Sequence, residues 1–307
     1  MTEHPITKQA IRNSMVPFIS IITPIYNRKK FLLGLYESLD SQTCKDFEWI
    51  VVDDGSMDEP EAFFRETCIK SFPARYIKKE NGGKHTAVNL GVKEANGELV
   101  LILDSDDTLP KDSIEKIQHY YSLCKERKDC GGVCGLMAHH DGSLIGKGFA
   151  QEHLYENSLD LRYRLHVTGD LLEVFKTTVL RECPFPEIAS EKFCPEALVW
   201  NRIATKYKLY CFNEVVYHRD YLDGGLTDKI VKIRMNSPIA TMMTYQELTV
   251  CDIPLLPKMK AAINYWRFRW CCQQKDKSGI TIPTINWYWN IFMPIGWMMH
   301  LKDVKSN

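Results

Sequence analysis

Apolar and polar positions divide the first third of the chain into mostly apolar runs and amphipathic segments. Apolar runs rich in branched residues occur at Val16–Ile22, Phe47–Val52 and Leu99–Leu103. Such runs are typical of strands that are buried on both faces of a sheet. After the first run, apolar residues from Phe31 to Leu39 recur at helical spacing. The alternation predicts an α/β fold, with an open sheet flanked by helices.

The remaining elements are predicted from the same two periodicities. Helices are expected over Glu61–Cys68, from Lys84 to Ala95, from Ile114 to Cys124, over Asp170–Leu180, from Pro195 to Tyr207 and over Ile230–Leu248. Strands are expected over Arg75–Lys78, Gly132–Ala138 and Ser143–Phe149, the last two joined by a turn at His139–Gly142.

Acidic residues follow the third apolar run directly. Asp104, Asp106 and Asp107 stand at the end of a predicted buried strand. Three neighbouring carboxylates repel one another and are costly to desolvate, and a divalent cation would relieve that cost. Hard oxygen ligands suit magnesium, manganese or calcium. The alternative is an acidic turn before the next helix, with Asp112 or Ser113 as its cap.

Polar residues also follow the other two runs. Asp53 and Asp54 come after the second strand, and Tyr26 and Asn27 lie in the loop after the first. In open α/β sheets, ligands bind at the carboxyl ends of the strands. A carboxylate there can accept hydrogen bonds from a base or from ribose hydroxyls. Ordinary turn chemistry is the competing interpretation.

A glycine pair, Gly82-Gly83, precedes a helix that begins near Lys84. Free backbone N–H groups at a helix start favour anions, and Lys84 adds a positive charge. The GxxxxGKS/T spacing of a Walker loop is absent, and no GxGxxG occurs. A phosphate contact is therefore expected here without a dinucleotide-binding motif.

Composition excludes some function classes. Lys plus Arg and Asp plus Glu each total 39 of 307 residues, so no global field favours nucleic acid. The eleven cysteines lack paired CxxC spacing, which indicates free thiols in a reducing compartment. The N-terminus lacks the apolar core of a signal peptide, and no run approaches the roughly 18 apolar residues of a spanning helix. A cytoplasmic location is expected.

Four motifs occur in a recognisable order: ISIITPIYNR (Ile19–Arg28), WIVVDDGSMD (Trp49–Asp58), ENGGKHTAVNLG (Glu80–Gly91) and LILDSDD (Leu101–Asp107). Together they resemble the family-2 glycosyltransferases. The resemblance covers roughly the first 110 residues, with weaker matches to about Thr227. It implies a GT-A-type, Rossmann-like mixed sheet and an inverting transfer from a nucleotide sugar.

The resemblance also implies roles for individual residues. The nucleotide would contact Pro24, Tyr26, Asn27, Asp53, Asp54, Lys84 and Asp104. Asp104 and Asp106 would form a DxD pair that holds Mn²⁺ or Mg²⁺ against the diphosphate, where the metal neutralises the leaving group. One position departs from the family pattern, because Val88 stands where an Arg is common. Lys84 would supply positive charge instead.

Two glutamates are candidates for the catalytic base. An inverting transfer needs a carboxylate that takes the proton of the acceptor hydroxyl. Family members carry a Glu-Asp pair before a helix, and here Pro195-Glu196 stands in its place. Glu196 is the first candidate and Glu191 the second. Favourable placement of Glu196 at a helix start is the structural alternative.

The composition changes from Lys229 onward. Residues 1–228 are expected to form the catalytic domain, and residues 229–307 a helical, aromatic-rich extension. Five of the seven tryptophans lie in this extension, interleaved with Arg and Lys. Such a composition suits a membrane interface. Packing on the catalytic domain and a dimer contact are the alternatives.

The sequence as a whole predicts a metal-dependent glycosyltransferase. We expect a UDP-sugar donor and a glycan or lipid-linked acceptor, in cell-surface polysaccharide biosynthesis. A peripheral position on the cytoplasmic membrane face is expected if the extension binds lipid. One alternative is a sugar nucleotidyltransferase, although TPIYNR replaces the glycine-rich loop of that class. A non-catalytic sugar- or nucleotide-binding scaffold is another.

Overall fold

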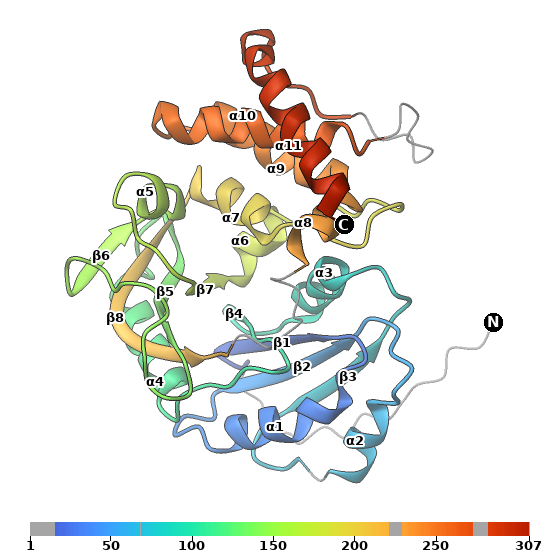
Figure 1. Cartoon of the computed structure of the whole chain (residues 1–307). Helices are drawn as coiled ribbons and strands as arrows, with labels where there is room; N and C mark the ends of the chain where they lie inside the picture. Colours follow the sequence, from blue (N-terminus) through green and yellow to red (C-terminus); the bar gives the residue numbers. More distant parts are fainter. Residues whose placement is uncertain (1–15, 68, 221–228, 273–281, 307) are drawn as a thin grey trace.

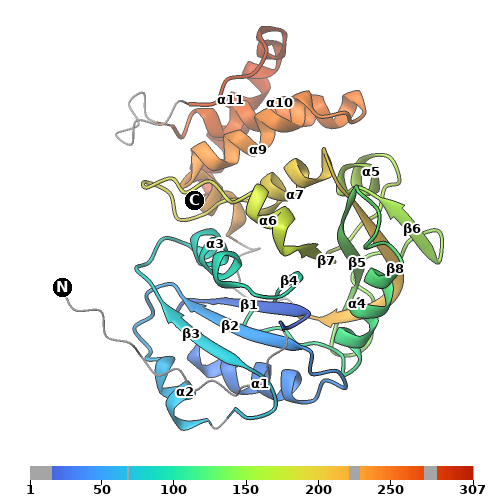
Figure 2. The same cartoon turned by 180° about the vertical axis from the view of Figure 1, so that it is seen from behind.

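The computed structural model describes residues 16–67, 69–220, 229–272 and 282–306. Within them, eight strands form one mixed sheet in the order β3-β2-β1-β4-β7-β5-β8-β6. The strands are β1 (Ile19–Ile25), β2 (Phe47–Asp53), β3 (Ala74–Lys78), β4 (Leu99–Ile102), β5 (Cys130–Ala138), β6 (His153–Glu156), β7 (Leu171–Lys176) and β8 (Lys208–His218). Helices lie on both sides of the sheet (Figures 1 and 2).

The helices follow the strands in the expected α/β pattern. The α-helices are α1 (Leu32–Asp40), α2 (Glu61–Glu66), α3 (Lys84–Glu94), α4 (Ser113–Ser122), α5 (Ser158–Tyr163), α6 (Thr177–Glu182), α7 (Glu196–Ala204), α8 (Ile230–Met235), α9 (Pro238–Val250), α10 (Leu255–Arg269) and α11 (Met293–Ser306). Two short 3₁₀ helices, η1 (Lys29–Phe31) and η2 (Trp287–Phe292), complete the described part.

The first four strands form a parallel half-sheet. β1 pairs in parallel with β2 and β4, and β2 pairs in parallel with β3. Ile25 at the end of β1 lies opposite Asp53 at the end of β2. The carboxyl ends of these strands therefore share one edge of the sheet. β7 runs antiparallel between β4 and β5 and makes the sheet mixed.

Two apolar layers enclose the sheet because its strands alternate between faces. Ile19 and Ile21 pack with α1 and α4 in one cluster of buried residues. Ile22 faces the opposite way and packs with α3 and α7 in a second cluster. Helices on both faces explain why the parallel strands read as continuous apolar runs in the sequence.

Two predictions in the middle of the chain were wrong. Asp170–Leu180 was expected to be a helix, but it forms β7 and then α6. The apolar residues of β7 point to both faces and join both core clusters, a pattern that also fits a short helix. Ser143–Phe149 does not form a strand; one isolated bridge joins Ala138 to Leu144. β7 and β8 occupy the two edges of β5, which leaves no edge for another strand.

The C-terminal helices pack above α6 and α7 (Figure 1). The single helix predicted over Ile230–Leu248 is divided into α8 and α9, because Pro238 lacks the N–H that would continue α8. Arg202 on α7 forms an ion pair with Glu247 on α9, with nitrogen and oxygen 2.6 Å apart. The extension is therefore anchored on the core through α9.

Candidate functional site

The loops that follow β1, β2 and β4 meet at one edge of the sheet. They contain Tyr26–Arg28, Asp54–Asp58 and Asp104–Asp107. The parallel pairing of the three strands brings these loops together, although they lie far apart in the sequence. The three polar loops therefore lie at the carboxyl edge of the parallel strands, where ligands bind in open α/β sheets.

Asn27 fixes the β1 loop to the β2 loop through both its backbone and its side chain. The Asn27 N–H donates to Ser56 Oγ at 2.9 Å, and Asn27 Oδ1 accepts from the Met57 N–H at 2.8 Å. Asn27 has a φ of 54°, which turns the chain sharply after the strand. Tyr26 is left 49% exposed at this edge. Pro24 is buried inside β1, so β1 extends through residues expected to be loop.

Asp53 and Asp54 are both buried and are both bound by protein donors. Asp53 accepts from the Ser56 N–H at 2.8 Å and from the Tyr76 hydroxyl at 2.5 Å. Burial and the Asp53 carboxylate raise the pKa of Tyr76 well above its usual value. Tyr76 therefore stays protonated and keeps donating to Asp53.

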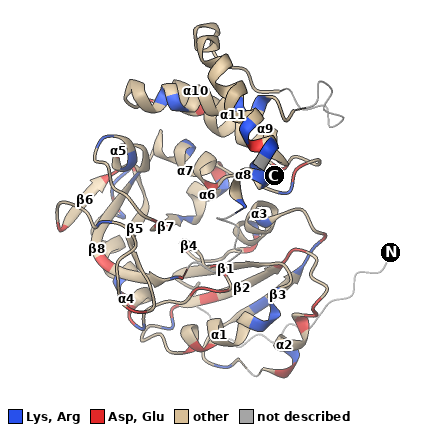
Figure 3. Cartoon of the chain, in the orientation of Figure 1, with Lys and Arg blue, Asp and Glu red and all other residues tan. Residues whose placement is uncertain are grey.

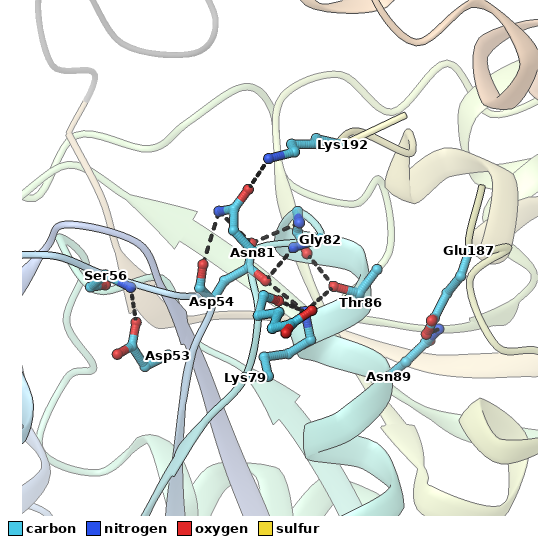
Figure 4. Close-up of polar contacts among 12 residues, drawn as sticks. Asp53, Asp54, Ser56, Lys79, Asn81, Gly82, Thr86, Asn89, Glu187 and Lys192 are labelled. Carbon is cyan, nitrogen blue, oxygen red and sulfur yellow. Dashed lines mark hydrogen bonds and ion pairs between the residues drawn. The ribbon is translucent and has the colours of Figure 1, made fainter. Parts of the chain in front are cut away.

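Asp54 organises the loop before α3 (Figure 4). Its two oxygens accept from the N–H groups of Gly82 and Gly83 at 2.9 and 2.7 Å, and from Lys79 Nζ at 2.7 Å. Asn81 also donates to Asp54. The carboxylate therefore holds the glycine pair in the position from which α3 starts.

Gly83 is required by both its backbone and its surroundings. Its φ is 99°, and a Cβ built there would lie 2.0 Å from the Lys192 carbonyl oxygen. We expect Gly83→Ala to lower the free energy of unfolding by about 3 kcal/mol, because a rarely allowed backbone and an overlap add together. Urea unfolding would measure it. Gly34→Ala is the matched control, since its Cβ would meet nothing within 4 Å in α1. Equal stability of Gly83→Ala and wild type would contradict this prediction.

Lys84, at the start of α3, contacts residues at two other places in the fold. Its Nζ lies 2.7 Å from Asp104 Oδ1, after β4, and 2.9 Å from Glu196 Oε1, at the start of α7. Burial alone would lower the pKa of Lys84, but these two carboxylates raise it well above its usual value. Burial likewise opposes ionisation of Asp104, but Lys84 holds the pKa of Asp104 below its usual range. Lys84 and Asp104 therefore both stay ionised.

The segment before Glu196 is held against α3. Lys192 Nζ donates to Asn81 Oδ1 at 2.6 Å, and Asn89 Nδ2 donates to Glu187 Oε1 at 2.8 Å (Figure 4). The Asn89 side chain also exchanges hydrogen bonds with the backbone of Phe185. These contacts place the start of α7 beside the β4 loop.

Glu191 has a different environment from Glu196. It is buried, and its carboxylate accepts from the N–H groups of Ile239 and Ala240 at 2.6 and 2.9 Å. These are the first free N–H groups of α9, which a carboxylate satisfies well. Glu196 has a 45% exposed side chain and lies at the shared edge. Of the two candidate bases, Glu196 is therefore the more accessible at this edge.

Asp106 forms an ion pair with Arg28, a residue for which the sequence predicted no role. The Arg28 Nη1 and Asp106 Oδ2 atoms are 2.8 Å apart. Arg28 lies in the first of the four sequence motifs, and this position was the signal from which a role could have been predicted. Among the described residues, no group of three His, Cys, Asp or Glu side chains could hold a metal. Asp104 and Asp106 still offer hard carboxylate oxygens, which fit a divalent cation that takes its other ligands from water and a diphosphate.

The residues around the metal candidates connect the β4 loop to the end of β8. Tyr217 donates to Asp107 Oδ2 at 2.7 Å and accepts from the Asp104 N–H at 3.1 Å. Burial, followed by the charge of Asp104, raises the pKa of Asp107 to about 7. Arg219 Nη1, just after β8, lies 2.9 Å from Asp170 Oδ2.

Two hollows lie away from this cluster of carboxylates. One of about 730 Å³ is lined by α5, α9 and α10 and includes Arg162, Tyr245 and Lys260. The other, of about 490 Å³, includes Asn27 and Asp58 beside α2. Neither is lined by the acidic residues of the β4 loop. The larger hollow therefore does not mark the candidate site, which the arrangement of the carboxylates indicates better.

The chain is similar to known proteins over much of its length. The sequence model described as "Glycosyl transferase family 2" matches residues 20–175, half of the chain. An uncharacterized glycosyltransferase of Rickettsia conorii is 41% identical over 236 residues, which are 76% of this chain and 35% of that protein. The chain spans less than half the length of the curated relatives that it matches.

Two solved structures share the fold. Staphylococcus aureus TarS in complex with UDP-GlcNAc has a TM-score of 0.61 and 20% identity, covering 82% of this chain and 72% of that one. The mannosyltransferase PcManGT from Pyrobaculum calidifontis, in complex with GDP-Man and Mn²⁺, has a TM-score of 0.56 and 15% identity, covering 96% and 77%. The mixed sheet with flanking helices confirms the expected GT-A-type fold.

Proposed function

Because the chain belongs to the family-2 glycosyltransferases, we propose that it is an inverting enzyme. It would transfer a sugar from a UDP-sugar to a glycan or lipid-linked acceptor in cell-surface polysaccharide biosynthesis. The observation that carries this proposal is the contact of Lys84 with both Asp104 and Glu196. The Lys84 ammonium therefore lies between a candidate diphosphate site, at Asp104, and a candidate base, Glu196.

The donor side of the proposal uses the loops after β1, β2 and β4. Tyr26 and Asn27 would contact the nucleoside, together with Asp53 and Asp54 at the end of β2. Asp53 and Asp54 are buried, so they would contribute in part by holding these loops in the shape that binds the nucleoside. We propose UDP as the nucleotide of the donor because TarS was solved with UDP and with UDP-GlcNAc.

The diphosphate side would use Asp104, Asp106 and Lys84. A divalent cation bound there would neutralise charge on the departing nucleoside diphosphate. Mn²⁺ accompanies GDP-Man in PcManGT, which supports a metal here. Lys84 would add a fixed positive charge beside the same phosphates. Its raised pKa keeps it charged at neutral pH.

The acceptor side would use Glu196 as the base. Its carboxylate would take the proton of the acceptor hydroxyl as the oxygen attacks the anomeric carbon. The bond between that carbon and the diphosphate oxygen breaks, and the configuration at the carbon inverts. Before this step, Lys84 must exchange its contact with Glu196 for one with the phosphates, so that Glu196 is free to accept the proton.

A thermal-shift panel tests the donor assignment. UDP, GDP, CMP and dTDP would each be added with and without Mn²⁺. A ligand at 100 times its dissociation constant stabilises the fold by about 2.7 kcal/mol, so a selective nucleotide raises the melting temperature by several degrees. We expect the largest shift with UDP and Mn²⁺ together. If no nucleotide shifts the melting temperature, the chain acts as a scaffold and the proposed function is wrong.

We assign catalysis to residues 1–228 and membrane contact to residues 229–307. The second part has eleven Lys and Arg residues against four Asp and Glu, and Figure 3 shows basic residues on α8, α10 and α11. Large apolar side chains on η2 and α11 are exposed: Trp287 by 81%, Ile291 by 75%, Met298 by 59% and Trp297 by 47%. Exposed aromatic residues with positive charge suit an anionic lipid surface.

No described helix is long and apolar enough to cross a membrane. A lipid-linked acceptor would nevertheless bring the enzyme to the lipid surface. The proposed location is the cytoplasmic face of the membrane, with α9 packed on the core and with η2 and α11 facing lipid.

Liposome pelleting measures this surface contact. The protein is expected to pellet with vesicles that contain phosphatidylglycerol, and Trp287→Ser with Ile291→Ser is expected to weaken binding at least about tenfold, because two buried apolar contacts are lost. Leu33→Ser with Leu165→Ser is the matched control, since these leucines are about half exposed on the catalytic domain. Pelleting of the first double variant at the wild-type level would rule out this face.

A further inference from the structure

Arg28 is held at the edge of the metal candidates by the loop around it. Asn27 fixes the preceding turn through its two hydrogen bonds to the β2 loop. The Arg28 guanidinium carbon lies 5.2 Å from the centre of the Phe31 ring, a favourable distance for a cation over an aromatic face. The side chain is therefore aimed at Asp106 by its own surroundings.

The ion pair of Arg28 differs from that of Lys84. Lys84 contacts two carboxylates, Asp104 and Glu196. Arg28 has one carboxylate partner among the described residues, Asp106, and its side chain is 33% exposed. If a divalent cation took the Asp106 oxygens, Lys84 would keep both of its carboxylate partners, whereas Arg28 would keep none among the described residues. Asp106 is thus the carboxylate on which the ion pair of Arg28 depends.

We propose that Arg28 is a donor-binding residue that neutralises Asp106 while no divalent cation is bound and contacts the donor diphosphate when one is. In the first arrangement Arg28 faces Asp106 and Lys84 faces Asp104 and Glu196; in the second, the divalent cation would face the two aspartates, and Arg28 and Lys84 would face the diphosphate. A planar guanidinium with five donors suits phosphate oxygens well. This inference rests on the proposed function for its donor.

The inference requires that Arg28 competes with the metal and favours the nucleotide. Mn²⁺ binding would be measured by electron paramagnetic resonance of the free ion, with and without UDP. We expect Arg28→Gln to bind Mn²⁺ about tenfold more tightly without UDP, because the competing cation is gone. With Mn²⁺ present, UDP should bind to Arg28→Gln about tenfold more weakly than to the wild type. Arg28→Lys should keep part of the UDP affinity, since it keeps the charge and loses the fork.

Lys30→Gln is the matched control. It removes one positive charge from the same loop, and its ammonium lies over the same Phe31 ring at 4.8 Å. It should leave both affinities at the wild-type level. If Arg28→Gln and Lys30→Gln change Mn²⁺ affinity alike, the effect is that of net charge and the inference is overturned.

Two further outcomes separate this inference from the proposed function. Unchanged Mn²⁺ affinity in Arg28→Gln, with sugar transfer by the wild type, would overturn the exchange and leave the function standing. Tighter Mn²⁺ binding and weaker UDP binding, without sugar transfer by the wild type, would support the exchange and overturn the enzyme assignment. If neither wild type nor Arg28→Gln binds Mn²⁺, the inference fails.

Discussion

Replacing Glu196 with Gln is expected to slow sugar transfer about 10³-fold while donor binding stays near the wild-type level. The amide keeps the size of the side chain and can still accept from Lys84, but it cannot take a proton from the acceptor. Donor binding is proposed to use the loops after β1, β2 and β4, and the amide keeps a contact with Lys84, so the affinity for UDP should change little. Released UDP would be measured in a coupled assay, and UDP affinity by calorimetry.

Glu191→Gln is the control for this prediction. It alters a carboxylate of the same segment that accepts from the first N–H groups of α9. We expect the free energy of unfolding to fall by about 2 kcal/mol, while the folded variant transfers sugar near the wild-type rate. Wild-type turnover by Glu196→Gln would remove that residue as the base. A large loss of turnover in a stable Glu191→Gln protein would transfer the role to Glu191.

Replacing Asp106 with Asn is expected to abolish the part of the UDP-dependent thermal shift that requires Mn²⁺. Transfer should fall by at least about 100-fold, because charge developing on the diphosphate loses its metal counterion. The substitution leaves the fold intact, since Asp106 is partly exposed and lies in a loop. The thermal shift and the UDP-release assay would be run on the same preparation.

The matched control for Asp106 is Asp112→Asn. Asp112 lies just before α4 and pairs with Lys116 at 2.9 Å, so the same charge is removed outside the β4 loop. It should keep the Mn²⁺-dependent shift and the activity. If Asp106→Asn retains a full Mn²⁺-dependent shift with UDP, the metal does not bind at the β4 loop, and the DxD assignment is incorrect.

The sequence by itself determined the parallel half of the fold and the edge at which the polar loops meet. Runs such as Leu99–Leu103 are buried on both faces, so their strand character is visible without any partner. Asp53 and Asp104 stand at the ends of such runs, and parallel pairing forces those ends together. Local pattern and topology agree there, and the expected α/β fold was correct for that reason, whereas its GT-A type was implied by the family resemblance.

Only the tertiary structure decided how the second half completes the sheet. The apolar residues of Leu171–Lys176 fit a short helix or a strand equally well, and the free edges of β4 and β5 selected the strand. β8 then occupied the remaining edge of β5 and excluded the strand expected over Ser143–Phe149. Short apolar segments take their conformation from the partners available to them.

The same distinction applies to the candidate site. Residue types and motif order suggested Asp104, Lys84 and Glu196 one by one, but nothing in the spacing brings a helix start near residue 196 to the β4 loop. The roles of Arg28 and Glu191 likewise depend on contacts with Asp106 and with α9. A sequence pattern reports which side chains are available and which local conformation they favour. Whether a carboxylate faces a cation, a helix end or solvent depends on packing between distant segments.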